Sequence, residues 1–236
     1  MQISVIIPTL NEEKNIAELL SILNRELREV KREIIVVEAA SIDNTVRLAD
    51  KCGGRVLPVD QKCRAFQMNR GAQVASGEIL CFVHADSRPP KGFFHDILQA
   101  FHEGFDIGCF RFKFDSSKVL LKINAYFTRF DREMCRGGDQ TFFIKRFEFN
   151  RLGGHNERLK IMDEYAFMRK ARKELKFKII PKDVIVSARK YEENSYFRVN
   201  LVNLVIFASF NLGVSQNWLV KMYKKLLIHP KVEGLE

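Results

Sequence analysis

Several polar side chains in this 236-residue chain directly follow segments that have the composition of buried strands. The clearest case is His84-Ala85-Asp86, which follows the apolar run 79–83. A carboxylate presented at the end of a buried strand suits Mg²⁺ or Mn²⁺, which can bridge to a diphosphate. We therefore expect Asp86 to hold a divalent metal, with His84 as a second ligand. The alternative is a capped turn before Pro89-Pro90.

Two further strand ends carry groups that could contact a nucleotide. Glu38 follows the apolar segment 33–37, and its carboxylate could accept hydrogen bonds from a base or from ribose hydroxyls. Arg64 lies near the start of a predicted helix, where the helix dipole and the guanidinium would both attract phosphate. The simpler interpretations are a solvated loop charge for Glu38 and a solvated basic helix start for Arg64.

The loop after the first apolar segment reads Pro8-Thr9-Leu10-Asn11-Glu12-Glu13. It lacks the glycines of a Rossmann fingerprint or a P-loop, so neither kind of phosphate cradle is predicted. By themselves, Asn11 and Glu12 are best explained as residues that cap the following helix.

These loops need a scaffold that brings them together. Apolar segments at 2–8, 33–38, 54–59 and 79–83 read as strands, and helical segments lie between them. This alternation predicts an α/β fold with a mostly parallel sheet flanked by helices. Ligands of such sheets bind outside the carboxyl ends of the strands. The loops 8–12, 38–43, 60–69 and 84–90 are therefore expected to form one site.

The second part of the chain is less regular. We expect an exposed or edge strand at 107–114, a helix at 119–130, strands at 140–144, 177–180 and 183–187, and a helix at 163–175. Two amphipathic or buried helices at 196–212 and 216–228 form a helical tail. We predict one domain, with a nucleotide-binding half (1–90), an acceptor half (91–190) and the tail (191–236).

The net charge of +10 is unevenly distributed. Residues 1–110 carry 13 basic and 15 acidic residues, residues 111–159 carry 11 and 6, and residues 160–236 carry 15 and 8. Such a positive field suits a phosphorylated ligand, an anionic membrane or nucleic acid. The tail aromatics have helical spacing among Leu and Val, which favours a core or membrane-interfacial face over base stacking.

Compartment signals are modest. Five widely spaced cysteines lack the spacing of a thiolate zinc site and suit reduced thiols. The start of the chain has no basic segment of the kind found in signal peptides. The charge-free stretch 199–220 contains seven Asn, Ser and Gln residues, which disfavours a membrane span. We expect a cytoplasmic protein, with the inner face of the membrane as a further location.

Together, the four loops resemble the family-2 glycosyltransferases with a GT-A fold. The resemblance rests on Val5-Ile6-Ile7-Pro8-Thr9-Leu10-Asn11-Glu12-Glu13, on residues 36–45 and 64–72, and on Phe82-Val83-His84-Ala85-Asp86-Ser87. It covers residues 2–190 and is greatest for a small soluble subgroup with a His-Ala-Asp version of the Asp-x-Asp motif. Two departures are His84 at the start of that motif and Glu38 where the family usually has Asp.

The resemblance implies a UDP- or GDP-linked sugar donor and a Mg²⁺ or Mn²⁺ ion on its diphosphate. The implied donor contacts are Pro8, Thr9, Leu10, Glu12, Glu38, Arg64, Asn69 and Asp86, with Asp86 and His84 as metal ligands. The implied acceptor and diphosphate contacts are Gly138, Asp139, Gln140 and Arg189. A solvated basic turn explains Arg189 equally well.

The resemblance also implies a general base for an inverting transfer to a hydroxyl or phosphate. The family often has Glu-Asp where this chain has Asp163-Glu164, so the base role passes to Glu164, with Asp163 as the second candidate. Favourable charge at a helix N-terminus is the simpler interpretation of both. The alternative functions are a sugar nucleotidyltransferase and a basic module that binds membrane or nucleic acid. We expect that nucleic acid is not a partner of this chain.

Overall fold

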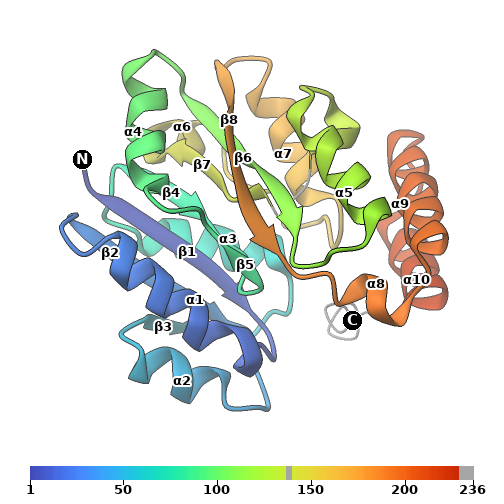
Figure 1. The fold of residues 1–236 in the computed structure, drawn as a ribbon, viewed down its shortest axis with the longest axis horizontal. Helices are drawn as coiled ribbons and strands as arrows, with labels where there is room; N and C mark the ends of the chain where they lie inside the picture. The colour runs from blue at the N-terminus through green and yellow to red at the C-terminus, as the bar shows by residue number, and fades with distance from the viewer. Residues whose placement is uncertain (137–139, 229–236) are drawn as a thin grey trace.

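The computed structural model describes residues 1–136 and 140–228, which form one large sheet between two layers of helices (Figure 1). The strands are β1 (Ile3–Thr9), β2 (Arg32–Glu38), β3 (Arg55–Pro58), β4 (Ile79–Phe82), β5 (Ser87–Arg88), β6 (Ile107–Phe114), β7 (Phe142–Lys145) and β8 (Phe177–Val186). The sheet order is β3-β2-β1-β4-β7-β6-β8-β5. The mostly parallel α/β sheet expected from the sequence is confirmed.

Ten α-helices lie in the described part of the chain. They are α1 (Glu13–Glu26), α2 (Thr45–Lys51), α3 (Arg64–Val74), α4 (Phe93–His102), α5 (Val119–Tyr126), α6 (Arg146–Arg151), α7 (Asp163–Ala171), α8 (Lys190–Glu193), α9 (Tyr196–Asn211) and α10 (Gln216–Leu226). Two short 3₁₀ helices are η1 (Phe127–Arg129) and η2 (Glu133–Cys135).

The first four strands in sequence form the parallel half of the sheet. β1 lies between β2 and β4, and β2 pairs with β3, all in parallel register. Side chains alternate across β1, so Ile3, Val5 and Ile7 pack against α1 while Ile6 packs against α3. Helices α1, α2 and α4 cover one face, and α3, α6 and α7 cover the other. Both faces are therefore buried, which explains the continuous apolar runs.

The second half reverses direction. β7 runs antiparallel to β4 and to β6, while β8 runs parallel to β6. The short strand β5, which follows Asp86, pairs antiparallel with β8. This pairing brings residues 187–190, at the end of β8, to the loop that carries Asp86.

Three sequence expectations in this half were wrong. Segment 107–114 is an interior strand of the sheet rather than an exposed or edge strand. Only its last four residues leave the core, and they resemble the alternation of an exposed strand. The two strands expected at 177–180 and 183–187 form the single strand β8, whose register with β6 shifts opposite Phe110 and Arg111. The helix expected at 119–130 ends at Tyr126 and continues as η1.

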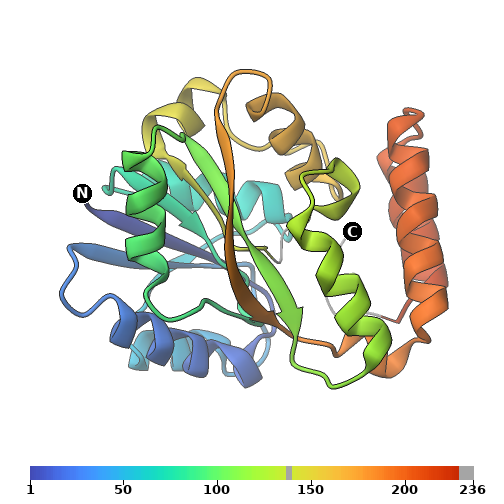
Figure 2. The same cartoon turned by 45° about the horizontal axis from the view of Figure 1, so that its top comes forward.

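The C-terminal helices form a hairpin at one end of the molecule, beside α5 (Figure 2). Val199, Val202 and Ile206 of α9 pack against Leu219 of α10 in a small core of their own. Ser195 and Ser215 cap the two helices by accepting hydrogen bonds from backbone N–H groups. Of the helices in residues 1–136 and 140–228, none combines the length and apolar character that a membrane crossing requires.

Candidate functional site

Glu12, Asp86 and Arg189 meet at the carboxyl edge of the parallel strands. Nη2 of Arg189 donates to Oε1 of Glu12 at 2.7 Å and to Oδ2 of Asp86 at 3.2 Å. Glu12 is the residue before α1, but its side chain makes no cap hydrogen bond and instead accepts from Asn15 and Arg189. The structure therefore brings together residues from three predicted site segments, and two carboxylates share one cationic group.

Residues 38–45 are tied to the first loop. The N–H of Asn11 donates to Oγ of Ser41, and Oδ1 of Asn11 accepts from the N–H of Ile42. Glu38 is buried, and Oε1 accepts from the N–H of Ser41. Asn11 has a positive φ of 53° and does not cap α1. The helix-cap interpretation of Asn11 and the solvated-charge interpretation of Glu38 are both wrong, because both side chains shape the loops.

Gln67 is a buried residue of the site that sequence reasoning missed. Its Nε2 donates to the carbonyl oxygens of Thr9 and Val37 at 2.9 and 2.8 Å, and so holds the ends of β1 and β2 together. Thr9 is also buried and donates to Val37, while Pro8 and Leu10 lie partly exposed beside it. The sequence signal that could have identified Gln67 is its amide side chain among the apolar positions of α3.

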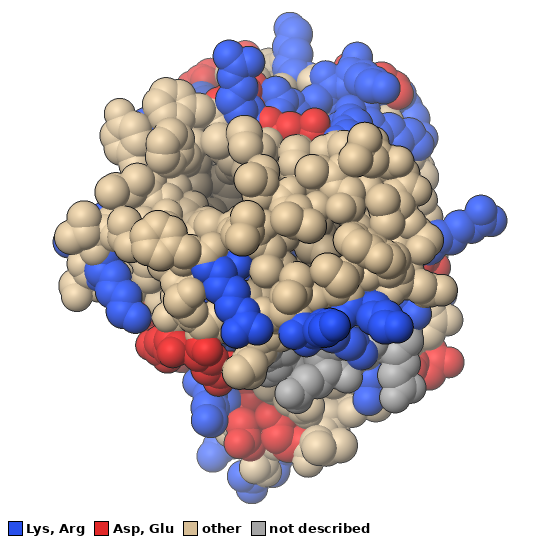
Figure 3. Space-filling model, turned by 90° about the vertical axis from the view of Figure 1, so that its right-hand side faces the viewer, with Lys and Arg blue, Asp and Glu red and all other residues tan. Residues whose placement is uncertain are grey.

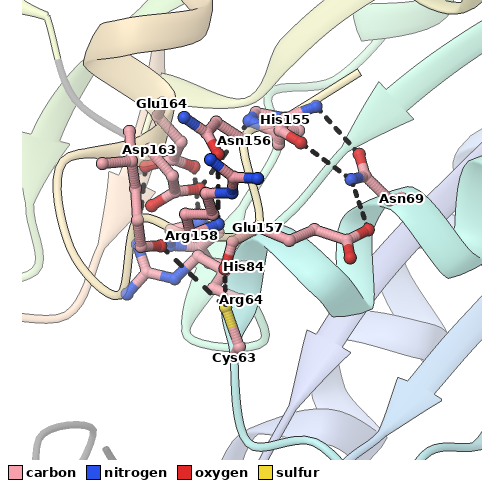
Figure 4. A network of polar contacts seen from close by, with 11 residues as sticks. Cys63, Arg64, Asn69, His84, His155, Asn156, Glu157, Arg158, Asp163 and Glu164 are labelled. Carbon is pink, nitrogen blue, oxygen red and sulfur yellow. Dashed lines mark hydrogen bonds and ion pairs between the residues drawn. The ribbon is translucent and has the colours of Figure 1, made fainter. Parts of the chain in front are cut away.

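A second cluster joins the Asp86 loop to helix α7 (Figure 4). Nε2 of His84 lies 3.2 Å from Oε1 of Glu164, and Nη1 of Arg64 lies 3.4 Å from Oε2 of the same carboxylate. His84 is buried, and its ring faces the predicted base. Arg64 therefore lies at the predicted helix start, close enough to Glu164 to form an ion pair.

The pKa values of the two acids of α7, Asp163 and Glu164, are shifted in opposite directions. Burial raises the pKa of Asp163 to about 7, and the neighbouring Glu164 carboxylate adds to this. Burial also opposes ionisation of Glu164, but the charges of His84 and Arg64 outweigh it and hold the Glu164 pKa well below its ordinary value. At neutral pH, Glu164 is ionised, whereas Asp163 is still partly protonated.

Asn69 fixes the loop that precedes α7. Its Nδ2 donates to the carbonyl of His155 and to Oε1 of Glu157, and its Oδ1 accepts from the N–H of His155. Gly154 has a φ of 66°, and a Cβ there would lie 2.6 Å from Oδ1 of Asn69. The glycine is required both for the backbone conformation and for the close approach of Asn69.

His155 lies inside an aromatic cage that the sequence did not reveal. Its ring contacts four phenylalanine rings, namely Phe82, Phe142, Phe149 and Phe167. Its Nδ1 is 3.7 Å from Oδ2 of Asp163, and burial lowers the pKa of His155 to about 4. A neutral imidazole therefore packs against the buried acid.

Of the remaining predicted residues, Gln140 is buried and lines a small cavity that also reaches Glu164 and His155. Gly138 and Asp139 lie outside the described residues. In residues 1–136 and 140–228, no group of three His, Cys, Asp or Glu side chains has the arrangement of a metal site. A metal at Asp86 would therefore need further coordinating oxygens from the bound diphosphate.

Comparisons with known proteins agree with this architecture. The sequence model of Glycosyl transferase family 2 matches residues 4–176. A Dolichol-phosphate mannosyltransferase of Pyrococcus furiosus is 31% identical over 112 residues, which are 45% of this chain and 32% of that protein. An uncharacterized glycosyltransferase of Synechocystis is 29% identical over 115 residues, 45% of this chain and 36% of that protein. The chain thus spans about a third of the length of these curated relatives.

Solved structures share the fold at low sequence identity. Staphylococcus aureus TarS (residues 1–349, in complex with UDP) matches with a TM-score of 0.66 and 19% identity, over 96% of this chain and 70% of that one. The mannosyltransferase PcManGT of Pyrobaculum calidifontis, in complex with GDP-Man and Mn²⁺, matches with a TM-score of 0.67 and 18% identity, over 94% and 63%. The GT-A fold that the sequence resemblance implied is confirmed, and the chain belongs to glycosyl transferase family 2.

Proposed function

We propose that this chain transfers a sugar, with inversion, from a UDP- or GDP-linked donor to an acceptor hydroxyl or phosphate. The observation that carries the proposal is the 3.2 Å contact between His84 and Glu164, since it places the predicted base beside the predicted donor loop. A direct displacement needs these two elements at one centre.

The donor class is supported by the structural neighbours. TarS has been solved with UDP and with UDP-GlcNAc, and PcManGT with GDP-Man. In this chain, the nucleoside would lie on the loops of Pro8, Thr9, Leu10 and Glu38. The diphosphate would lie near Arg64 and Arg189.

A divalent metal is part of the proposal, and the residues fit one. Asp86 and Glu12 already hold a guanidinium between them, so both carboxylates are placed to share a positive charge. Magnesium sites of this kind use one or two carboxylates and complete their coordination with phosphate oxygens and water. When bound, the metal would neutralise charge on the leaving diphosphate. His84 stays a predicted second ligand, although its Nε2 faces Glu164.

Glu164 is the proposed base and Asp163 the second candidate. Glu164 is ionised through His84 and Arg64, and it reaches the cavity that Gln140 also lines. Asp163 is only 3% exposed, and Nδ1 of the buried His155 ring lies 3.7 Å from its carboxylate, so it is less accessible to an acceptor. Family membership supports sugar transfer over the nucleotidyltransferase and nucleic-acid alternatives.

Contact with a membrane surface completes the proposal. The exposed apolar side chains of α5, η1, α9 and the residues that end η1 and α9 form what we call the apolar face, comprising Val119, Leu120, Ile123, Tyr126, Phe127, Phe130, Phe197, Leu201, Leu204, Val205 and Leu212. Asn124 of α5 donates to Asn200 of α9, so the two helices are neighbours. Figure 3 shows this side of the molecule as a broad uncharged surface bordered mostly by Lys and Arg and in places by Asp and Glu.

The charge pattern around the apolar face fits an anionic bilayer. Segment 116–130 contains three basic residues and segment 194–228 contains four, and neither contains Asp or Glu. Such surfaces lie in the interface of anionic membranes. With the five unpaired cysteines, this pattern supports the cytoplasmic face of a membrane as the place of action.

The test of the proposed function is calorimetric titration of the protein with UDP and with GDP, in the presence of Mn²⁺ and in its absence. We expect one of the two nucleotides to bind, and to bind more tightly with the metal. If neither nucleotide binds in the presence of Mn²⁺, the assignment of the donor site is wrong.

A further inference from the structure

A cavity of about 240 Å³ lies between helix α7 and the segment that contains η2. Its lining consists of Glu133, Arg136, Tyr165, Met168, Arg169, Arg172 and Lys173. Tyr165, Met168, Arg169 and Arg172 are spaced three, one and three residues apart, so they form one face of the helix. The volume far exceeds the roughly 10–15 Å³ that one water requires.

The cavity is strongly cationic. Arg169 pairs with Glu133 at 2.5 Å, and Arg172 pairs with Asp131 at 2.7 Å. Lys173 is exposed at the rim. Among the residues that the structure describes, four cations therefore face two carboxylates, which is an excess of positive charge.

Arg136 is the unusual member of this set. It is only 4% exposed, and it donates to Sγ of Cys109 and to the carbonyls of Thr128 and Phe130. Its Nε is buried without a hydrogen-bond partner, and no carboxylate in residues 1–136 or 140–228 binds this guanidinium. Burial raises the pKa of Cys109 to about 11, so that thiol does not balance the charge. A buried charge without a counter-ion is costly to folding.

This cavity continues toward the proposed base. The smaller cavity lined by Glu164 and Gln140 shares Arg136, Tyr165 and Met168 with it. An anion beside Arg136 would therefore lie next to the place where the acceptor must be activated.

We propose that the cavity binds a phosphate group of the acceptor, with Arg136 as the inner ligand and Arg169, Arg172 and Lys173 around the entrance. That the phosphate belongs to the acceptor rests on the proposed function, whereas the anion site itself rests on the cavity alone. Guanidinium groups bind phosphate through charge-assisted hydrogen bonds. Such a ligand would supply the counter-charge that Arg136 does not find among residues 1–136 and 140–228.

The phosphate could belong to a soluble compound or to a lipid headgroup. The cavity borders the apolar face, because η2 begins three residues after Phe130, and because Arg169 donates to Asn211 and lies over the ring of Phe210 on α9. A bilayer in contact with that face would bring headgroup phosphates to the cavity entrance.

The test measures binding of inorganic phosphate and glycerol 3-phosphate by calorimetry, with saturating UDP or GDP and Mg²⁺ to fill the donor site. A parallel arm uses phosphatidylcholine vesicles with and without phosphatidic acid. The double variant Arg172→Gln, Lys173→Gln should weaken binding about tenfold or more, as expected for the loss of charge-assisted contacts. Arg136→Lys, which keeps the charge but loses the planar fork, should also weaken it.

Arg55→Gln is the matched control, since Arg55 is an exposed, Glu33-paired arginine on the distant strand β3. Its phosphate affinity should equal that of the unaltered protein. If neither phosphate source binds the unaltered protein, or if the double variant binds as tightly, the inference is overturned. Retained nucleotide binding in those cases would leave the proposed function standing, whereas phosphate binding without nucleotide binding would overturn only the donor site.

Discussion

Nη2 of Arg189 lies 3.2 Å from Oδ2 of Asp86, the carboxylate on which a metal-bound diphosphate would rest. The same nitrogen binds Glu12, so an arginine from the end of β8 neutralises two acids at the end of the parallel sheet. A metal at Asp86 would compete with Arg189 for the same oxygen. The arginine would turn to the diphosphate as the metal and nucleotide bind.

Replacing Asp86 tests this exchange. We expect Mn²⁺ to raise the affinity of the unaltered protein for its nucleotide about tenfold, or about 1.4 kcal/mol. Asp86→Ala should remove this metal effect, because no carboxylate remains at that position. Calorimetry with Mn²⁺ and with EDTA measures the ratio. Asp96→Asn, which alters a Lys182-paired acid on α4, should keep the full ratio; a metal effect that survives Asp86→Ala would place the metal elsewhere.

Replacing Glu164 tests the base. Glu164→Gln keeps the shape of the side chain but removes its charge, and we expect nucleotide release from the sugar donor to slow about 10²–10⁴-fold. Donor affinity should be preserved. The assay follows formation of free UDP or GDP over time. Glu174→Gln, which changes an exposed glutamate paired with Arg151, should leave the rate unaltered. If the Glu164→Gln variant releases nucleotide at the rate of the unaltered protein, Asp163 becomes the candidate base.

The part of the site that we propose binds the donor could be predicted from sequence because its determinants are local. Each strand is a buried run, each ligand loop follows one, and parallel strands end at the same edge. Asp86, Glu12 and Arg64 therefore lie at the expected edge. The family resemblance implied Arg189 as a diphosphate contact, but its ion pair with Asp86 could not be foreseen, because Arg189 reaches that carboxylate only through the pairing of β5 with β8, segments about a hundred residues apart.

The proposed acceptor half depends on long-range packing that leaves little sequence signal. β8 was divided at Pro181-Lys182, yet the strand continues through a register shift against β6. Sequence reasoning did not single out His155 or Arg136, since nothing local marks their burial. The Gly153-Gly154 pair before His155 was the available signal of a tight loop.

Asp163 should make stability depend on pH. Its folded pKa is raised to about 7 from an ordinary 3.8, so its contribution is complete below pH 3.8 and is lost as pH rises toward 7. Asp163→Asn mimics the protonated acid and should flatten this loss. Melting temperatures between pH 5 and pH 8 measure it, with Asp50→Asn on the surface of α2 as a control that keeps the original slope. An unchanged slope in Asp163→Asn would mean that Asp163 is ionised in the folded protein.

Adjacent glycines allow a matched test of the Asn69 contact. Gly153 and Gly154 both have positive φ, so alanine strains the backbone at either position by about 1–2 kcal/mol. Only at Gly154 would the new Cβ meet Oδ1 of Asn69, because nothing lies within 4 Å at Gly153. We expect Gly154→Ala to lower the melting temperature more than Gly153→Ala. Equal losses in melting temperature for the two variants would show that the Asn69 side chain moves aside without a loss of stability.

The apolar face should bind anionic membranes. Phe197 on α9 is 74% exposed and Phe147 on α6 is 72% exposed, so two changes of equal chemistry can be compared at sites inside and outside the face. We expect cosedimentation of the unaltered protein with vesicles that contain phosphatidylglycerol, and much less with pure phosphatidylcholine, because the basic residues need an anionic surface. Phe197→Ser should reduce the bound fraction, since it removes buried apolar area worth about 2 kcal/mol. Phe147→Ser should not. Equal losses in both variants, or a concentration-dependent dimer that disappears with Phe197→Ser in the absence of vesicles, would assign the face to another partner.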